Sequence, residues 1–413
     1  MRRAGPFRLR RLANGTVGRN IGVLGLSIAA QLSRDVVLIL ILGFGSALDV
    51  VKASTAIQVY LFTTMASAAA NHFHGTRGAR LGDFFVVYAA FAVLAQYVLF
   101  DLVVAPGFTG DKLDDARFYG HVALLLSIVV MPYAVYRHRY LEARRYPYIA
   151  GQQLVVSLLY IAGFLILFRF VEGTPAAFFA YCLAVLIYFA IVVGRSGGTA
   201  LTGGWRSLAL SAGGLTAWTA VFAAQAVQSS ARFIDRAFAS TLGDGYFALV
   251  DVIYAILAGL TMLPLGVFSI FMAARFAQRA DWQRYLRLAM LAASALALVL
   301  SLPLIAGVGL GGSLSLAGVT LSLRDMALAF VAPLAFVSGS IGFHALLSLG
   351  DSRAAFAIVF AKIGCKFAYL LALPQMRLFD ILVSIVVTEA LASLVIVWRS
   401  ALITGSPRHP GDG

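Results

Sequence analysis

Long apolar runs separated by short polar breaks recur along the chain from Ile21 to Ile403. A helix that crosses a bilayer needs about 20 mostly apolar residues, and these runs have that length. Strands of a membrane barrel would instead alternate apolar and polar residues over segments of about 10 positions. The pattern therefore predicts an all-α polytopic membrane protein with about twelve transmembrane helices. Their expected centres lie near residues 33, 62, 93, 130, 159, 185, 223, 260, 297, 337, 363 and 392.

The overall composition agrees with this interpretation. Of the 413 residues, 61% are apolar and 12% are charged, and the mean hydropathy is +0.89. Soluble domains are about 45–50% apolar and about 25% charged. The longest polar stretches are residues 1–19 and the loop from Asp101 to Phe118, too short for a separate soluble domain. The predicted units are a basic arm (1–19), an N-terminal six-helix lobe (20–200), a C-terminal six-helix lobe (201–405) and a tail (406–413).

The net charge of +14 indicates membrane orientation rather than nucleic-acid binding. A soluble protein this basic would suggest nucleic acid as a partner, but the cytoplasmic loops of membrane proteins also collect Lys and Arg. Basic residues concentrate in the arm and in every second predicted loop, such as 137–145 and 275–287, whereas Asp111, Asp114 and Asp115 lie in an intervening loop. We therefore expect both termini in the cytoplasm, with membrane lipids and no nucleic acid as partners.

An internal repeat relates the two halves of the sequence. Asp35 and the Gly-x-Gly segment 43–45 are matched 200 residues later by Asp235 and by the Gly-x-Gly segment 243–245. Because each half holds an even number of predicted spans, the halves would have the same topology, which is a parallel repeat. Secondary transporters are built in this way, with the substrate site between the halves. An ancient duplication in another kind of membrane protein is the alternative.

Ionisable residues inside the predicted spans are the candidates for function, since each costs about 2.5–3.5 kcal/mol at a helix centre. Arg232, Asp235 and Arg236 are spaced i, i+3, i+4 and should share one face of span 7. One interpretation is an anion-binding or cation-coupled stripe that faces a central cavity. The alternative is a self-neutralised cluster near the membrane surface, with the arginine head groups reaching toward water.

Other charges in the spans divide by their depth. Arg34 lies near mid-span and is expected to face the cavity, whereas the adjacent Asp35 points about 100° away. Asp49, Lys52 and Asp251 lie near the outer ends of spans, where ordinary interface residues are favoured, although Lys52 is also a candidate for the cavity.

The last two spans carry further charges. Glu389 is mid-span in span 12 and must be protonated, paired or ion-coordinating. Lys362 and Lys366 lie i, i+4 in span 11. The sequence has no phosphate-binding P-loop, no HExxH motif and no recognisable catalytic constellation. It predicts neither an enzyme nor a metal centre.

Several short segments carry a family resemblance, and they occur in family order over nearly the whole chain. They resemble the multidrug/oligosaccharidyl-lipid/polysaccharide (MOP) exporter superfamily, most closely its MurJ-type (MviN-like) lipid II flippases. The segments are Ser33-Arg34-Asp35 with 43–49, Ala105-Pro106-Gly107-Phe108, Ile234-Asp235-Arg236-Ala237-Phe238-Ala239-Ser240, Leu263-Pro264-Leu265-Gly266-Val267-Phe268 and Gly350-Asp351-Ser352-Arg353.

The resemblance implies a two-lobed, MATE-like fold with a central cationic cavity. It implies a flippase that carries a polyprenyl-diphosphate-linked glycan across the bacterial cytoplasmic membrane by alternating access, alongside cell-envelope biosynthesis proteins. No cofactor is implied, although Na⁺ or H⁺ remains open as a coupling ion. Arg34 matches the family's conserved arginine of span 1, Asp235 matches a coupling-ion position and Glu389 matches one roughly, and the residues matched for structure are Asp49, Pro106, Gly107 and Pro264. Because a diphosphate needs fixed positive charge, the candidates for binding substrate are Arg34, Lys52, Arg232 and Arg236.

Two departures from the family leave the transported sugar open. The cavity arginines that the family carries in spans 2 and 8 are not matched, and its two additional spans are not among the twelve predicted here. An exopolysaccharide or O-antigen unit fits as well as lipid II. Two other functions remain: a cation-coupled drug antiporter of the same fold, which would favour a net acidic cavity, and a non-transporting scaffold for cell-envelope polysaccharide assembly.

Overall fold

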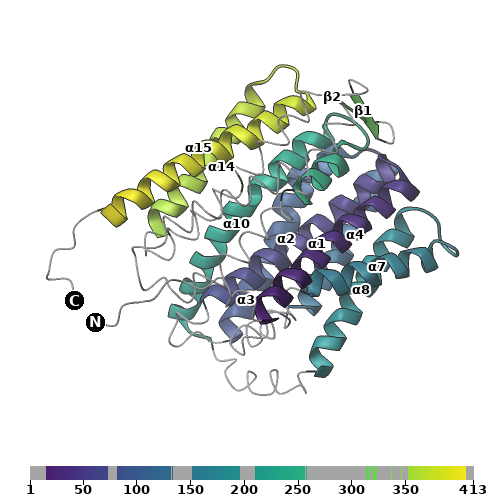
Figure 1. Ribbon diagram of the computed structural model, residues 1–413, viewed down its shortest axis with the longest axis horizontal. Coiled ribbons are helices and arrows are strands. Elements are labelled where there is room, and N and C mark those ends of the chain that lie inside the picture. Colours follow the sequence, from purple (N-terminus) through teal and green to yellow (C-terminus); the bar gives the residue numbers. More distant parts are fainter. Residues whose placement is uncertain are drawn as a thin grey trace.

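In the computed structural model (Figure 1), the described part of the chain is helical apart from one short β-hairpin. It comprises residues 15–72, 81–131, 133, 151–195, 210–255, 257, 313–316, 319–322, 336, 346 and 352–405. The elements are α1 (Gly15–Leu42), α2 (Ser46–His72), α3 (Leu81–Ala95), the π-helix η2 (Gln96–Val104), the 3-10 turn η3 (Ala105–Gly107), α4 (Asp111–Val129), α7 (Gln152–Leu167), α8 (Thr174–Arg195), α10 (Ala212–Ser240), β1 (Ser313–Leu316), β2 (Val319–Ser322), α14 (Ser352–Ala372) and α15 (Leu378–Gly405). A shorter apolar helix, Tyr246–Ala255, follows α10.

The chain is a multi-pass membrane protein by the length and composition of its helices. Within the described residues, five helical segments are long and apolar enough to cross a bilayer. They are Gly22–Leu42, Gly82–Gly107, Thr174–Arg195, Arg353–Ala372 and Leu378–Arg399. The predicted span near residue 297 lies outside the described residues, as does nearly all of the span near 337, so the total of twelve stays a prediction.

The N-terminal helices form one apolar core. α1 packs against α7, α2 packs against α4 and α8, and α7 packs against α8. Aromatic side chains such as Phe84, Phe100, Phe164 and Phe178 are fully buried between these helices. A second apolar cluster joins α10, the helix Tyr246–Ala255 and α15, and α14 packs against both α10 and α15.

Helix α10 belongs to both cores. Trp218 and Phe222, in its first half, pack against Phe84 of α3, whereas Ala239 near its end joins the C-terminal cluster. Figure 1 shows α10 running between the N-terminal helices and the α14–α15 pair. The predicted lobe boundary between residues 200 and 201 stays a prediction.

The two Gly-x-Gly turns of the sequence repeat contact each other. Gly43 ends α1 with φ of 71°, and Gly245 precedes the helix Tyr246–Ala255 with φ of 89°. Backbone of this kind favours glycine because other residues clash there. A Cβ atom on Gly245 would also lie 3.0 Å from the backbone carbonyl of Phe44. Glycine therefore allows the turn after α10 to approach the turn after α1.

Two predictions about loops need correction. The predicted loop from Asp101 to Phe118 is mostly helical, because η2 continues α3 through Val104 and α4 begins at Asp111. The acids Asp111 and Asp114 lie in the first turn of α4, where negative charge is favoured by the helix dipole. The loop predicted between spans 9 and 10 contains the antiparallel hairpin β1–β2.

Candidate functional site: a charged cavity between the two halves

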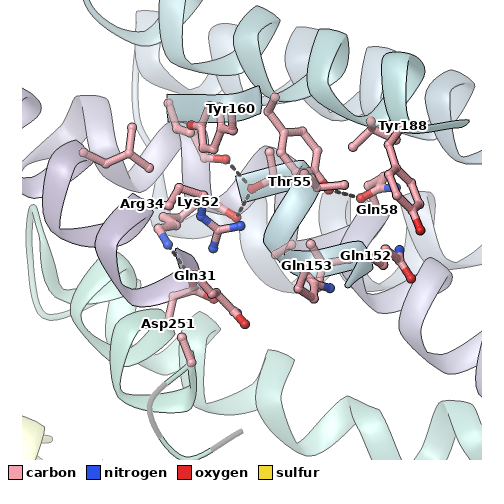
Figure 2. Close-up of a pocket in the computed structure, with 18 of the residues that line it drawn as sticks. Gln31, Arg34, Lys52, Thr55, Gln58, Gln152, Gln153, Tyr160, Tyr188 and Asp251 are labelled. Carbon is pink, nitrogen blue, oxygen red and sulfur yellow. Dashed lines mark hydrogen bonds and ion pairs between the residues drawn. The ribbon is translucent and has the colours of Figure 1, made fainter. Parts of the chain in front are cut away.

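A cavity of about 140 Å³ lies between the N-terminal helices and the C-terminal half of the chain. α1, α2, α7 and α8 line it on one side, and α10 and the helix Tyr246–Ala255 line it on the other. Figure 2 shows Arg34, Lys52 and Asp251 close together at one end of this cavity. The charged residues of its lining are Arg34, Lys52, Arg232, Arg236 and Asp251.

A chain of ion pairs connects four helices across this end of the cavity. Arg34 donates to Asp35 Oδ1 from Nε and Nη2, at 3.1 and 2.9 Å. Lys52 Nζ lies 2.8 Å from the same Asp35 oxygen and 3.0 Å from Asp251 Oδ2. Arg236 pairs with the other oxygen of Asp251. Lys52 thus bridges two carboxylates, one from each half of the chain.

This network is neither neutral nor fully hydrogen-bonded. Four basic side chains, including Arg232, face the two carboxylates Asp35 and Asp251, which leaves a net charge of +2. Within the described part of the chain, Arg232 forms no salt bridge; its guanidinium lies 5.6 Å from the Tyr254 ring centroid. Two buried atoms of the network, Asp35 Oδ2 and Arg236 Nε, have no hydrogen-bond partner among the described residues.

The structure therefore revises several sequence-based expectations about this region. Lys52 is buried and, with Asp251, lines the cavity, so the favoured interpretation of the two as interface residues was wrong. Arg34 faces the cavity, as its depth suggested, and it bends to pair with the adjacent Asp35. For Lys52 and Asp251, depth along a span was a poor guide because the two form an ion pair with each other although they are distant in sequence.

Asp235 does not share the cavity-facing stripe with Arg232 and Arg236, which corrects the expectation of one common face. Its side chain is fully buried in the C-terminal half, and Oδ2 lies 2.5 Å from Lys366 Nζ. The Tyr254 hydroxyl donates to the same oxygen, and the Ser384 hydroxyl donates to Oδ1 at 3.3 Å. The i, i+3 step places Asp235 on the edge of the stripe, where α14 and α15 are its neighbours.

The second candidate for a coupling ion is also paired with a lysine. Glu389 Oε1 lies 2.7 Å from Lys362 Nζ, and both side chains are nearly buried. The ammonium groups of Lys362 and Lys366 thus lie beside the carboxylates, where a coupling cation would need its ligands. In this arrangement Asp235 and Glu389 do not fit a sodium ion, and their role in coupling stays a prediction.

Asp49, which matches the family's conserved acid after span 1, joins the two halves away from the cavity. Its carboxylate accepts hydrogen bonds from the backbone N–H groups of Gly245 and Ala248, at 2.6 and 2.7 Å. These groups lie at the start of the helix Tyr246–Ala255, where the helix dipole favours a negative charge. Asp49 therefore holds the start of α2 against the start of a helix from the other half.

The Pro106-Gly107 element also lies at this contact. Both residues form the turn η3, and a Cβ atom on Gly107 would lie 1.8 Å from Ser240 Oγ at the end of α10. Glycine is therefore needed for this approach between η3 and α10. The remaining family-matched residue, Pro264, lies outside the described residues.

Sequence reasoning missed a polar contact at the opposite end of α10. Ser211 caps this helix by accepting from the Gly214 N–H at 3.1 Å. Asp83, in the first turn of α3, accepts hydrogen bonds from the Ser211 backbone N–H and hydroxyl at 2.8 and 2.9 Å. The partners are 128 residues apart. A serine ahead of a helix is a recognisable cap signal, but nothing in the sequence pointed to Asp83.

Comparisons with known proteins place this arrangement in a known fold. No protein-family model matches the chain, and no curated protein sequence matches it. Solved structures do match over nearly its whole length. A structure of the lipid II flippase MurJ in an inward closed conformation covers 92% of this chain and 87% of its own, with a TM-score of 0.63 and 12% identity.

Two further structures extend the similarity to other transporters. A MATE transporter from Vibrio cholerae matches with a TM-score of 0.57 and 13% identity, covering 94% of this chain and 95% of its own. A MOP superfamily transporter from Pyrococcus furiosus, described as having a binding pocket of reversed polarity, matches with a TM-score of 0.56 and 15% identity, covering 98% and 100%. The chain thus has the fold of MOP superfamily transporters, as the sequence resemblance predicted.

Proposed function

We propose that this protein is a transporter that moves a polyprenyl-diphosphate-linked glycan across the membrane by alternating access. The observation that carries the proposal is the net positive cavity between the two halves, lined by Arg34, Lys52, Arg232 and Arg236. A sugar-bearing diphosphate has one negative charge on each phosphorus, which matches the +2 that the ion network leaves uncompensated.

The chemistry of the basic residues suits a diphosphate. Hydrogen bonds between guanidinium groups and phosphate oxygens are short and strong because both partners are charged. Arginine also keeps its charge in a desolvated site and presents several N–H donors in a fixed plane. The attraction is larger in a cavity enclosed by protein than in water, because the effective dielectric constant is lower. Arg232 is the first candidate to bind the diphosphate, because it has no carboxylate partner among the described residues.

The cavity must widen to accept such a ligand. Pockets for small molecules have volumes of about 300–1,000 Å³, whereas this one is about 140 Å³. Contacts close both ends of α10 against the N-terminal helices: Asp83 with Ser211 at one end, and Gly107 beside Ser240 at the other. In an alternating-access cycle these contacts would break in turn, so that the cavity opens to one side of the membrane at a time.

The remaining predictions about cellular context belong to this proposal. We place the protein in the bacterial cytoplasmic membrane, with both termini in the cytoplasm, because of the alternation of basic loops. Its surroundings would be membrane lipids and cell-envelope biosynthesis proteins. The transported sugar, whether part of lipid II or of another polysaccharide unit, is left open by the family resemblance.

A cation-coupled drug antiporter of the same fold is the second candidate function, since MATE transporters share this fold. The charge of the cavity favours the glycan carrier, because a net +2 repels a cationic drug and attracts a diphosphate. A non-transporting scaffold is the third candidate. Both are tested by measuring transport directly.

The decisive experiment measures the appearance of lipid-linked sugar in the outer leaflet of cells depleted of their own flippase. The wild-type protein, Arg34→Ala and the double variant Arg232→Ala/Arg236→Ala are compared, with Arg169→Gln as the control. Arg169 is exposed in the turn after α7 and does not line the cavity. We expect transport by wild type and control, and loss of transport in the cavity variants.

The outcomes separate the candidates. If the wild-type protein moves no lipid-linked sugar, the flippase proposal fails, and export of a cationic dye under the same conditions would then identify the antiporter. If neither substrate moves, the scaffold is supported. If every variant flips lipid-linked sugar as well as wild type, the cavity assignment is wrong although the function stands.

A further inference from the structure

The cavity has a second zone, which differs in chemistry from the charged end. α7, α8 and the middle of α2 contribute tyrosines and glutamines to its lining, as does Tyr133 just after α4, and no ionised side chain of the described lining comes from α4, α7 or α8. Figure 2 shows Gln58, Gln152 and Tyr188 grouped away from Arg34 and Lys52. The tyrosine–glutamine wall consists of Gln58, Tyr133, Gln152, Tyr160, Tyr181 and Tyr188.

Hydrogen bonds within the tyrosine–glutamine wall fix the orientation of its amides. The Tyr133 hydroxyl donates to Gln152 Oε1 at 2.9 Å, and the Tyr181 hydroxyl donates to Gln58 Oε1. Each glutamine therefore directs its oxygen to a tyrosine and keeps its NH₂ group as a donor. The wall is a preorganised set of N–H donors and aromatic faces without formal charge.

Tyr160 marks the border between the two zones. The Arg34 guanidinium lies 5.8 Å from the centroid of its ring, so the residue is next to the charged end. Its side chain is buried at 3% exposure, yet its hydroxyl has no hydrogen-bond partner among the described residues. A buried hydroxyl without a partner costs about 1–3 kcal/mol. A ligand hydroxyl or ether oxygen at this point would recover that hydrogen bond.

We infer that the tyrosine–glutamine wall binds the sugar of the lipid-linked glycan, and that it selects an uncharged sugar over one that carries carboxylates. This inference rests on the proposed function. A sugar attached directly to a diphosphate must lie beside the phosphate groups, as the tyrosine–glutamine wall lies beside Arg34. Hydroxyls of a neutral sugar match the amide and phenol groups of the wall.

The selectivity follows from what the wall lacks. A carboxylate placed against this wall would lose its hydration and meet no cationic partner among the described residues of α4, α7 and α8. Burying a charge without a partner is costly. A site built to hydrogen-bond hydroxyl groups also disfavours ligands that leave its polar groups unpaired.

The test measures binding of three lipids to the full-length protein in nanodiscs. All carry the same polyprenyl diphosphate, esterified with a neutral hexose, with a hexuronic acid or with a methyl group. The methyl diester keeps the diphosphate charge and removes the sugar. The proteins are wild type, Tyr160→Phe, Gln152→Leu and the control Tyr97→Phe, which alters an exposed tyrosine of η2 that does not line the cavity.

We expect wild type to prefer the hexose lipid over both others. In Tyr160→Phe and Gln152→Leu, the ratio of affinities for hexose lipid over methyl lipid should fall about tenfold, the value of one hydrogen bond of about 1.4 kcal/mol. The ligand-free Tyr160→Phe protein should unfold at a temperature no lower than that of wild type, because its hydroxyl has no partner to lose.

Three results would overturn the inference. Equal binding of hexose and methyl lipids by wild type would show that the tyrosine–glutamine wall is not a sugar site, while the proposed diphosphate function would stand. Tighter binding of the hexuronic acid lipid would refute the selectivity. An affinity ratio unchanged in both wall variants would refute the residue assignment. Failure of wild type to bind any diphosphate lipid would instead refute the proposed function itself.

Discussion

Asp35 in α1 and Asp235 in α10 lie 200 residues apart, and each holds a lysine ammonium inside the protein. Both are almost inaccessible, and each precedes a Gly-x-Gly turn. Their surroundings nevertheless differ. The lysine beside Asp35 is Lys52, which lines the cavity and also pairs with Asp251. The lysine beside Asp235 is Lys366, which is fully buried and does not line the cavity.

The two clusters also differ in how completely they are hydrogen-bonded. Asp235 accepts from Lys366 and Tyr254 on one oxygen and from Ser384 on the other. Asp35 has one oxygen without a partner among the described residues. The Asp35 cluster can gain a hydrogen bond from a ligand, whereas both carboxylate oxygens of Asp235 already accept hydrogen bonds. An intramembrane charge is therefore a sign of a binding site when it faces a cavity and remains incompletely paired.

The largest effect that would test this comparison comes from Lys366→Met. This change leaves Asp235 as a buried charge without a cation, and breaking a buried pair in this way costs about 3–5 kcal/mol. We expect a large fall in the unfolding temperature in detergent. The double variant Lys366→Met/Asp235→Leu should recover most of it, because both charges are gone. A single variant as stable as wild type would contradict the assignment of this cluster as a sealed ion pair.

The second-largest expected effect is the stabilisation of a Lys366 variant by Na⁺. Lys366→Gln removes the ammonium and leaves Asp235, Tyr254 and Ser384 as oxygen ligands at the same place. We expect Na⁺ to raise the stability of this variant, by about 2.7 kcal/mol at a hundredfold excess over its dissociation constant. Thermal unfolding in NaCl and in choline chloride of equal ionic strength gives the measurement.

The matched control for sodium is Lys366→Gln/Asp235→Asn, which lacks the carboxylate and should not respond. Wild type should not respond either, since Lys366 already lies beside Asp235. Specific stabilisation of the wild-type protein by Na⁺ would show that the lysine does not take the place of a coupling cation.

The smallest effect on stability is expected at Lys52. In Lys52→Met, Asp35 keeps its bond with Arg34, and Asp251 keeps its bond with Arg236. The free energy of unfolding should therefore fall by only about 1–2 kcal/mol. By contrast, transport of lipid-linked sugar should fall strongly, because the cavity loses a positive charge. A Lys52 variant that is less stable than Lys366→Met would reverse the comparison.

Periodicity and glycine placement predicted much of the fold. Apolar runs located α1, α8 and α15, and the Gly-x-Gly segments located the turns after α1 and α10. The helical structure between Asp101 and Phe118 was missed because acidic residues can be read either as a loop or as the first turn of a helix. Polarity alone does not distinguish these, and the positive φ at Gly110 before α4 is a detail of the folded chain.

The candidate site was predicted less completely. Arg34, Arg232 and Arg236 were assigned to the cavity from their cost in a membrane, and they line it. Two neighbours of Asp235, Lys366 and Ser384, could not be predicted, because they lie on α14 and α15, more than a hundred residues away in sequence. The tyrosine–glutamine wall gave no signal, since tyrosines in an apolar span are also typical of an ordinary core.

The N-terminal cap of α10 also offers a way to observe the relative movement of α3 and α10. The Ser211 hydroxyl accepts from the Gly214 amide while it donates to Asp83 of α3. If α3 and α10 separate in the proposed transport cycle, that hydroxyl loses its hydrogen bond to Asp83, and the first turn of α10 becomes easier to fray. Deuterium uptake at the Gly214 amide would then follow the separation of α3 from α10. The Gly214 amide would thus report the proposed opening without an attached label.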